Sequence, residues 1–389
     1  MLQYFDGFVE CKIVLQESVT SVDIELLQEL FLKQYMRYEI IFSLLYSVPK
    51  ELVILLDKEI QCNKKNISLI TNHARLQKYL SKLGLSSKLN SLLEEISAQK
   101  QNNLYTYLEE YEEFVAYTRK CNDEKKQLKF LLQKVQKRYG YNFLEYNFEM
   151  MQRRLEIFIS RNRLLTLSDA AYFILTNPHS FQDFFLEVSI NVTEFFRDTT
   201  LYKYLHTIFT KEYYKKSNIK IWSAGCSSGE EPYSLAILLE CAQELDKSLI
   251  YATDFNHLVL KDAKNALYSN DHYNTLQNKF NELETECCID SYITKYSQFF
   301  QINNIITQKV LFLEHNLATD GSFNEFDIIM CRNVIIYFSQ ELQAKVIQLL
   351  YDSLRFGGYL VLGSHETMNL SFQNRFERVN DSAIYKKVA

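Results

Sequence analysis

The chain has 389 residues, enough for two or three domains of ordinary size, and 47% of them are hydrophobic, which supports substantial buried cores. A net charge of −5 argues against general nucleic-acid binding. The eight cysteines form no CxxC pair and no His/Cys spacing suited to zinc, so we expect a reducing compartment and no metal. No signal peptide is recognisable and no apolar run approaches the ~20 residues of a membrane span, which predicts a cytoplasmic protein without membrane insertion.

Residues 1 to about 120 carry apolar residues at helical spacing over long runs. This periodicity predicts an α-helical extension over residues 1–120, with candidate boundaries at Gln99–Asn103 and Cys121–Glu124. Its frequent tyrosines are more often core or interface residues than a functional site. The sequence of this region contains no motif that indicates a function.

Basic residues concentrate between residues 125 and 163. Two segments there, Leu128–Phe143 and Met150–Leu167, have the pattern of amphipathic helices, and Gly140 would end the first. Charged faces are usually solvated surface. An alternative is a docking face for an acidic partner, and the residues alone leave both interpretations open.

The segment Ile219–Leu239 reads as a strand, a glycine/serine turn and an amphipathic helix. Gly225 lets a ligand approach the backbone closely, and the helix offers unpaired amides at its start. Glu230 and Glu231 follow the turn directly and would repel a pyrophosphate, so a nicotinamide dinucleotide is disfavoured. They suit a ligand with hydroxyls and a cation, such as S-adenosylmethionine, although they could simply favour the helix dipole.

The second half of the chain alternates strands with helices, which predicts a mostly parallel sheet covered on both faces. Polar residues follow three of the strands, namely Asp254, Asn316, and Arg332 with Asn333. Ligands bind at the carboxyl ends of such strands, and Asp254 is suited to accept hydrogen bonds from ribose hydroxyls. Each residue alone is more often a turn-former, but their joint placement favours a binding site. A small antiparallel insertion is expected at about residues 290–312.

Five segments carry a family resemblance, in the order NVTEFFRD, WSAGCSSGEEPYSLA, ATDFN, EHNL and FDIIMCRNVIIYF. They closely resemble the CheR family of chemoreceptor glutamate methyltransferases, from about Gln127 to the C-terminus. The resemblance implies a basic helical domain over residues 125–190 and a Rossmann-like methyltransferase domain over residues 191–389. The fold class expected for the chain is therefore α/β, preceded by all-α N-terminal domains.

The same resemblance implies the cofactor and the site. The cofactor would be S-adenosylmethionine, with S-adenosylhomocysteine as the product. Arg197 and Tyr337 would lie near the transferred methyl group, where Arg197 could orient the acceptor and Tyr337 could donate a hydrogen bond to it. A glutamate carboxylate, with a reference pKa of about 4.3, is ionised at pH 7, so no strong general base is needed. The residues expected to line the cofactor are Asn191, Thr193, Arg197, Gly225, Glu230, Glu231, Asp254, Asn316, Leu317, Arg332 and Asn333.

The activity that the resemblance implies is methyl-ester formation on glutamates of chemoreceptor cytoplasmic domains, in chemotaxis adaptation. Docking would use the basic helices through Lys134, Arg138, Arg153 and Arg154. The antiparallel insertion looks like the family's β-subdomain, which in some members grips a receptor peptide, but it lacks the glycines expected there. The GSHET segment also departs from the family pattern. Alternatives are methylation of another protein or a small carboxylate, or a non-catalytic cofactor-binding regulatory module.

Overall fold

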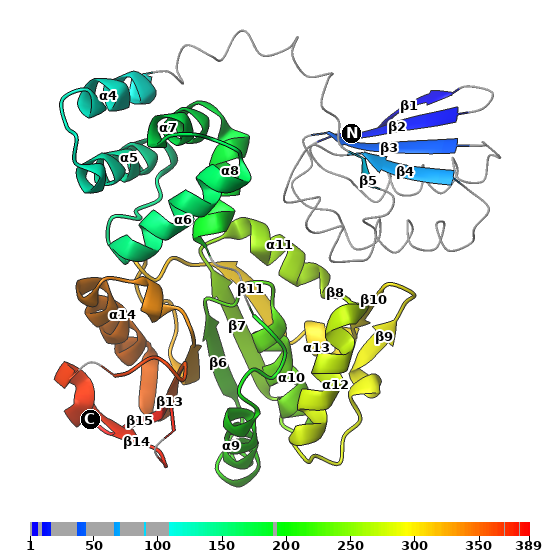
Figure 1. The fold of residues 1–389 in the computed structure, drawn as a ribbon. Coiled ribbons are helices and arrows are strands. Elements are labelled where there is room, and N and C mark those ends of the chain that lie inside the picture. Colours follow the sequence, from blue (N-terminus) through cyan, green and yellow to red (C-terminus); the bar gives the residue numbers. More distant parts are fainter. Residues whose placement is uncertain are drawn as a thin grey trace. The chain divides into compact units, whose positions relative to one another are not determined.

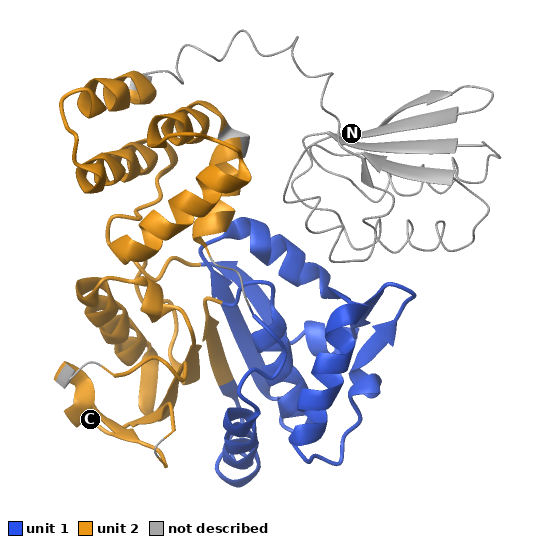
Figure 2. Ribbon diagram, viewed as in Figure 1, with its two compact units in different colours: residues 1–95, 193–219, 226–314 blue, residues 96–192, 220–225, 315–389 orange. Residues whose placement is uncertain are grey.

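The structure is a computed structural model that describes residues 109–189, 193–368, 370–380 and 382–389, together with five short strands before residue 91. The chain divides into two compact units. One comprises residues 1–95, 193–219 and 226–314, and the other comprises residues 96–192, 220–225 and 315–389 (Figure 2). They are called unit 1 and unit 2 below.

The five strands before residue 91 form a sheet of their own, in the order β1-β2-β3-β4-β5 (Figure 1). The β1 and β2 strands are antiparallel, and the pairs β2–β3, β3–β4 and β4–β5 are parallel. Their bounds are Leu2–Asp6 (β1), Glu10–Gln16 (β2), Arg37–Ser43 (β3), Asn66–Ile70 (β4) and Leu89–Asn90 (β5).

The prediction of an all-helical region over residues 1–120 is therefore wrong for these five segments. In β2, Cys11, Ile13 and Leu15 lie on one face, and the residues between and beside them are polar except for Val14, which approaches the period of a strand. In β3, Ile40 and Ile41 are β-branched and fit a pleated surface better than a helix. The helices predicted between the strands lie outside the described residues.

Unit 2 contains a helical domain that begins before the predicted boundary at residues 121–124. Helix α4 packs against α5 and α7, and buries the side chain of Phe114 completely. Helix α5 starts where Asp123 accepts hydrogen bonds from the amides of Lys125 and Lys126, and ends at Gly140, which has φ +80° as the sequence predicts. The helices are Glu109–Thr118 (α4), Glu124–Tyr139 (α5), Phe148–Arg161 (α6), Leu167–Thr176 (α7) and Pro178–Val188 (α8).

Helix α4 also covers part of the predicted basic face of α5. Lys134 forms an ion pair with Glu113, and Arg138 lies 3.9 Å from a carboxylate oxygen of Glu110. Only 10% of the Lys134 side chain and 9% of the Arg138 side chain are exposed. The prediction that these two residues form a docking face is therefore wrong, because α4 supplies glutamates that the pattern of a single helix cannot reveal.

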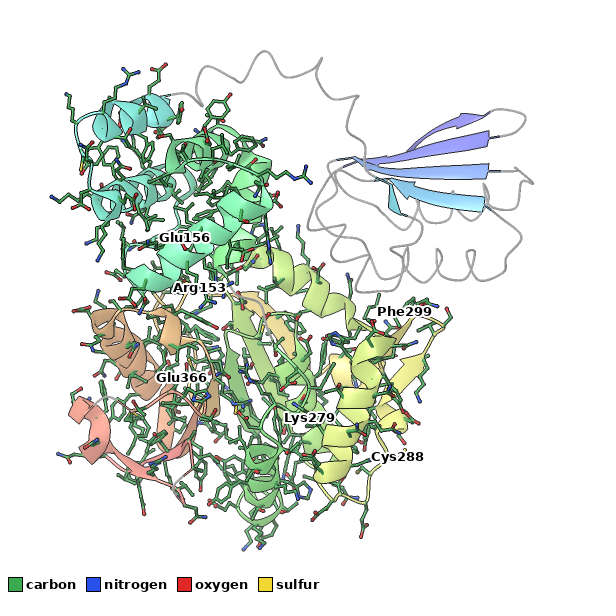
Figure 3. All side chains as sticks on the ribbon, in the orientation of Figure 1. Arg153, Glu156, Lys279, Cys288, Phe299 and Glu366 are labelled. Atoms are coloured by element: carbon green, nitrogen blue, oxygen red, sulfur yellow. The ribbon has the colours of Figure 1, made fainter. Side chains whose placement is uncertain are left out.

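The basic residues of α6 differ from one another. Arg154 contacts Glu187 of α8 at 3.3 Å, and Arg161 forms an ion pair with the same carboxylate. Arg153 is exposed and makes no ion pair with any residue in the described part of the chain (Figure 3). Of the four residues predicted to meet an acidic partner, Arg153 alone is both exposed and free of an ion pair there.

The methyltransferase-like part of unit 1 contains two parallel strands, β7 and β11, in which Val310 lies opposite Ile250. A separate antiparallel sheet has the order β8-β10-β9 and confirms the predicted insertion, although β8 begins earlier than expected. The strands are Ser248–Asp254 (β7), Leu267–Ser269 (β8), Ile293–Lys295 (β9), Phe299–Ile302 (β10) and Val310–Glu314 (β11). The helices are Thr199–Lys211 (α9), Glu230–Cys241 (α10), His257–Asn265 (α11), Asn270–His272 (η3), Tyr273–Glu282 (α12), Ile289–Tyr292 (η4) and Asn304–Thr307 (α13).

Unit 2 contributes strands in the order β6-β12-β13-β15-β14. Strands β6, β12 and β13 are parallel to one another, β15 is antiparallel to β13, and β14 is antiparallel to β15. All six residues of β12 are buried, as in a central strand. The elements are Ile219–Ala224 (β6), Phe326–Cys331 (β12), Ile335–Tyr337 (η5), Gln340–Ser353 (α14), Leu354–Leu362 (β13), Leu370–Arg375 (η6), Phe376–Arg378 (β14) and Ile384–Lys387 (β15). The predicted alternation of parallel strands and helices is confirmed. In the described part of the chain, every helix is too short or too polar to cross a membrane.

Candidate active site

The turn before α10 is sharp and acidic. Gly229 has φ +94°, and a Cβ atom there would lie 3.1 Å from both Ala263 Cβ and the Tyr268 hydroxyl, so a glycine is required. The Ser228 hydroxyl donates to Glu230 Oε2 at 2.7 Å. The Glu230 side chain is buried, and helix α10 begins at this residue. The predicted strand-turn-helix arrangement is thus present, with its first carboxylate held inside the turn.

Asp254 lies at the end of β7, next to the same turn. Its Oδ2 accepts a hydrogen bond from the amide of Ser227 and its Oδ1 one from the amide of Asn256, both at 2.9 Å. Burial raises the pKa of Asp254 to about 6, although these bonds and one from the amide of Phe255 lower it. The carboxylate therefore stays ionised at neutral pH.

Three carboxylates surround the thiol of Cys226. Burial raises the pKa of this thiol, and the charges of Asp254, Glu231 and Glu230 raise it further. The thiol is therefore neutral and is not a nucleophile.

The segment NVTEFFRD is attached to the first turn of α10 through one hydroxyl. The amide of Phe196 donates to Ser234 Oγ at 3.0 Å, and Ser234 Oγ donates to the carbonyl oxygen of Glu230 at 2.7 Å. The ring of Phe196 packs against Tyr202, with centroids 5.2 Å apart. These contacts fix the main chain directly before Arg197, whose side chain is half-buried.

A cavity of about 230 Å³ lies beside Thr193. Glu194 of its wall forms an ion pair at 2.5 Å with Lys279 of α12, which is labelled in Figure 3. Phe195 packs edge-on against Tyr268, with centroids 4.8 Å apart. The remaining lining residues are Asp271, His272, Thr275 and Leu276.

In unit 2, main-chain amides of the loop after β12 converge on the carboxylate of Glu366, which is labelled in Figure 3. Glu366 Oε2 accepts from the amides of Gly363 at 2.6 Å and Asn333 at 2.8 Å. Glu366 Oε1 accepts from Val334 at 2.8 Å and Ile335 at 2.9 Å, and from the next amide, that of residue 336, at 3.4 Å. One buried side chain thus holds most of the loop that carries the predicted site residues.

The remaining predicted residues of unit 2 lie in different surroundings. Arg332 is buried and Tyr337 half-buried, and the carbonyl of Tyr337 accepts from the amide of Asn147 at 2.8 Å. The side-chain oxygen of Asn316 accepts from the amide of Ala318 at 3.0 Å, which forms a local turn. Leu317 is half-buried.

The structure assigns the predicted residues to both units. Thr193, Arg197, Glu230, Glu231 and Asp254 belong to unit 1. Asn191 lies outside the described residues. The others belong to unit 2, and they are Gly225, Asn316, Leu317, Arg332, Asn333 and Tyr337.

Sequence reasoning missed two residues that shape these surroundings, Ser234 and Glu366, and it noted Ser227 only as part of the glycine/serine turn. Ser234 follows Glu230 by one helical turn, and that spacing could have indicated its bond to the Glu230 carbonyl. Glu366 belongs to GSHET, a segment noted only as a departure from the family pattern. Ser227 Oγ is buried and finds no hydrogen-bond partner among the described residues. Such an orphaned hydroxyl beside Asp254 fits a hydroxylated ligand.

Comparison with known proteins identifies the family. Residues 191–384 match the family described as CheR methyltransferase, SAM binding domain. The putative methyltransferase Cher3 of Pseudomonas putida is 32% identical over 263 residues, which are 67% of this chain and 96% of that protein. Chemotaxis protein methyltransferases of Listeria innocua and Borreliella burgdorferi are 32% and 29% identical, over 63% and 64% of this chain and 91% and 90% of theirs.

The fold and this family match therefore define a methyltransferase that uses S-adenosylmethionine. More specifically, the chain belongs to the CheR methyltransferase family. The buried Ser227 hydroxyl, the ionised Asp254 and the glutamates of the α10 turn fit a cofactor that carries hydroxyls and a positive charge. When bound, this cofactor supplies a methyl group on a cationic sulfur.

Proposed function

We propose that this protein methylates glutamate side chains of chemoreceptor cytoplasmic domains, in the cytoplasm, during chemotaxis adaptation. Relatives in Listeria and Borreliella are named chemotaxis protein methyltransferases. The observation that carries the proposal is the bond from Phe196 through Ser234 to Glu230. It joins the segment that bears a permanent cation, Arg197, to a turn rich in carboxylates.

The positive charge of Arg197 and the negative charge of the turn suit the two reactants, an anionic acceptor and a cationic cofactor. The carboxylates of Glu230, Glu231 and Asp254 favour a cationic cofactor, and Asp254 with Ser227 can bind its hydroxyls. Arg197 favours and orients an anionic acceptor such as a glutamate. Tyr337 would donate a hydrogen bond to the same acceptor. Because the acceptor is already ionised at pH 7, catalysis consists mainly of alignment, which can lower a barrier by about 7–11 kcal/mol.

We further propose that Arg153 is a contact for the acidic partner. It is exposed and has no ion pair in the described ranges, unlike Arg154, which contacts Glu187. An exposed cation contributes to steering and register more than to affinity, and its effect falls with salt.

The proposal is tested by transfer of labelled methyl from S-adenosylmethionine to the cytoplasmic fragment of a chemoreceptor, scored as base-labile methanol. We expect label on the glutamate form and none on a receptor with glutamine at the methylated positions. Absence of label from the glutamate form, with cofactor binding retained, would instead favour another substrate or a regulatory module.

Variants test the residue roles in the same assay. Arg197→Ala should lower turnover by at least about 100-fold, because it removes a charge-assisted contact with the acceptor worth about 1.5–3 kcal/mol and its alignment. Arg119→Ala, at an exposed arginine after α4, is the matched control and should leave turnover unchanged. Equal turnover of the Arg197 variant and the wild type would remove Arg197 from the mechanism.

Charge reversal tests docking. Arg153→Glu should lower kcat/KM by about 2- to 5-fold at low salt, and less at high salt, as expected for an exposed charge contact. Lys211→Glu reverses an equally exposed charge on α9 and should have no effect. If both variants behave alike, docking lies elsewhere.

A further inference from the structure

The loop after β12 carries residues expected to bind the cofactor and the acceptor, yet it has little regular structure of its own. We infer that Glu366 is a positioning residue for methyl transfer, because its carboxylate fixes the conformation of residues 333–336. Glu366 itself touches neither reactant. The inference deepens the proposed function, because it concerns the same site.

Glu366 organises the loop through main-chain amides alone. Its side chain is 4% exposed, and its two oxygens accept five amide hydrogen bonds, four of them between 2.6 and 2.9 Å. Four consecutive amides, those of residues 333 to 336, point at one buried anion, which is the arrangement of an anion nest. Hydrogen bonds to an ionised acceptor are roughly twice as strong as neutral ones.

The five hydrogen bonds to Glu366 hold the loop after β12 in a backbone conformation that is unfavourable at Asn333. Asn333 has φ +58°, in the left-handed region that most side chains avoid and asparagine tolerates. At the other end of the loop, the carbonyl of Tyr337 accepts from the amide of Asn147. The segment is therefore fixed on one side by a carboxylate and on the other by the start of α6.

Close packing leaves the loop little freedom to adjust. A Cβ atom on Gly363 would lie 2.8 Å from Glu366 Oε2 and 2.9 Å from the amide nitrogen of Asn333. A Cβ atom on Gly225 would lie 2.5 Å from Val334 Cγ2. Gly225, a residue expected to line the cofactor, thus packs directly against the loop that Glu366 holds. A shift of the loop would therefore disturb Asn333 and Gly225, two of the residues of unit 2 that are expected to line the cofactor.

Strand β12, which precedes this loop, carries another buried carboxylate that provides a control. Asp327 lies at the beginning of β12 and is fully buried. It accepts from the amide of Lys220 at 2.8 Å and from the guanidinium of Arg355 at 3.2 Å, so it joins neighbouring strands and does not contact the loop. Loss of either carboxylate should lower stability, but only loss of Glu366 should change the site.

The experiment compares Glu366→Gln with Asp327→Asn. Glutamine keeps the size of the side chain, but its NH2 group replaces one acceptor oxygen. That group is a donor and would face amides that are donors themselves. We expect the Kd for S-adenosylmethionine, measured by calorimetry without any acceptor, to rise at least about 10-fold in Glu366→Gln. Hydrogen exchange of the amides of residues 333–336 should accelerate in that variant alone. Asp327→Asn should lower Tm and leave the Kd within about twofold of the wild type.

A wild-type Kd in Glu366→Gln, or an equal rise in both variants, would overturn the inference. Glu366→Asp, which keeps the charge on a shorter side chain, should restore part of the affinity. If Glu366→Gln does not fold, Gly363→Ala disturbs the same contact and should raise the Kd in the same way. Since cofactor binding is measured without acceptor, failure of receptor methylation would contradict the proposed function and leave this inference standing.

Discussion

Two buried carboxylates lie at or after the ends of strands in this protein, and they act differently. Asp254, the last residue of β7, accepts from the amides of Ser227, Asn256 and Phe255, and burial raises its pKa to about 6. Glu366, after β13, accepts from five amides of the two loops that it joins. A carboxylate has about four acceptor positions. Glu366 uses all of them within the fold, whereas the described part of the chain supplies Asp254 with three amide donors, beside the orphaned hydroxyl of Ser227.

The number of acceptor positions that the fold occupies distinguishes a ligand-binding carboxylate from a structural one. A saturated carboxylate has no capacity left for a ligand, and its removal should damage the fold around it. A carboxylate that is buried, ionised and incompletely bonded is costly to the fold, because desolvation opposes its charge. Such a cost is tolerated where a ligand is bound.

The largest effect that would test this contrast is expected from Asp254→Asn. The Kd for S-adenosylmethionine should rise by about 10- to 100-fold, since a charged hydrogen-bond acceptor worth about 1.5–3 kcal/mol is lost. Stability at pH 7 should not fall, because the substitution also removes a buried charge. Calorimetry and thermal unfolding measure both quantities. A variant that lost stability as Glu366→Gln does would end the distinction between the two carboxylates.

A smaller effect is expected from pH. In the folded protein the pKa of Asp254 is about 6, above its usual 3.8, so the folded state binds the proton more tightly. The contribution of this group to stability is therefore largest at low pH and declines as the pH rises from about 4 to about 6. Cofactor binding should follow the opposite course, because it requires the ionised form.

The corresponding measurement is the cofactor Kd at pH 5 and at pH 7.5. At pH 5 about one tenth of Asp254 is ionised, so the Kd should be about tenfold higher. In Asp254→Asn the two values should agree. Equal values in the wild type would show that the charge of Asp254 does not contribute to binding.

The smallest effect is expected from Ser227→Ala. Its hydroxyl is neutral, so its loss should cost about 0.5–1.5 kcal/mol, or about 2- to 10-fold in Kd. Thermal stability should be unchanged or higher, because the hydroxyl has no partner in the described part of the fold. Ser248→Ala is the matched control. The Ser248 hydroxyl donates to the Glu244 carbonyl at 2.7 Å, so this variant should lose stability and keep its affinity.

The sequence predicted those parts of the fold that depend on neighbours along the chain. The alternating strands and helices, the end of α5 at Gly140 and the turn that leads into Glu230 all follow from local patterns. Asp254 was predicted because a polar residue at the end of a buried strand is itself a local signal. Each of these features is encoded within about one turn or one strand.

The features that were missed depend on residues distant in the sequence. Glu366 accepts from amides about 30 residues earlier in the chain, and no local sequence pattern around Glu366 indicates which amides these are. The charges of Lys134 and Arg138 are neutralised by a helix that lies before the family resemblance. Strands β3 and β5 lie within apolar runs whose spacing also suited helices. Periodicity describes one element, and it does not identify what packs against that element.

Helix α4 also determines where the chain can be divided for experiments. A fragment that starts at residue 120 would keep every motif of the family and lose Phe114, which is fully buried and stacks near Phe130. Removal of a buried phenylalanine costs about 3–5 kcal/mol, and Lys134 would lose its carboxylate partner as well. A fragment that starts before residue 109 should therefore give more soluble protein and a higher melting temperature than the shorter one.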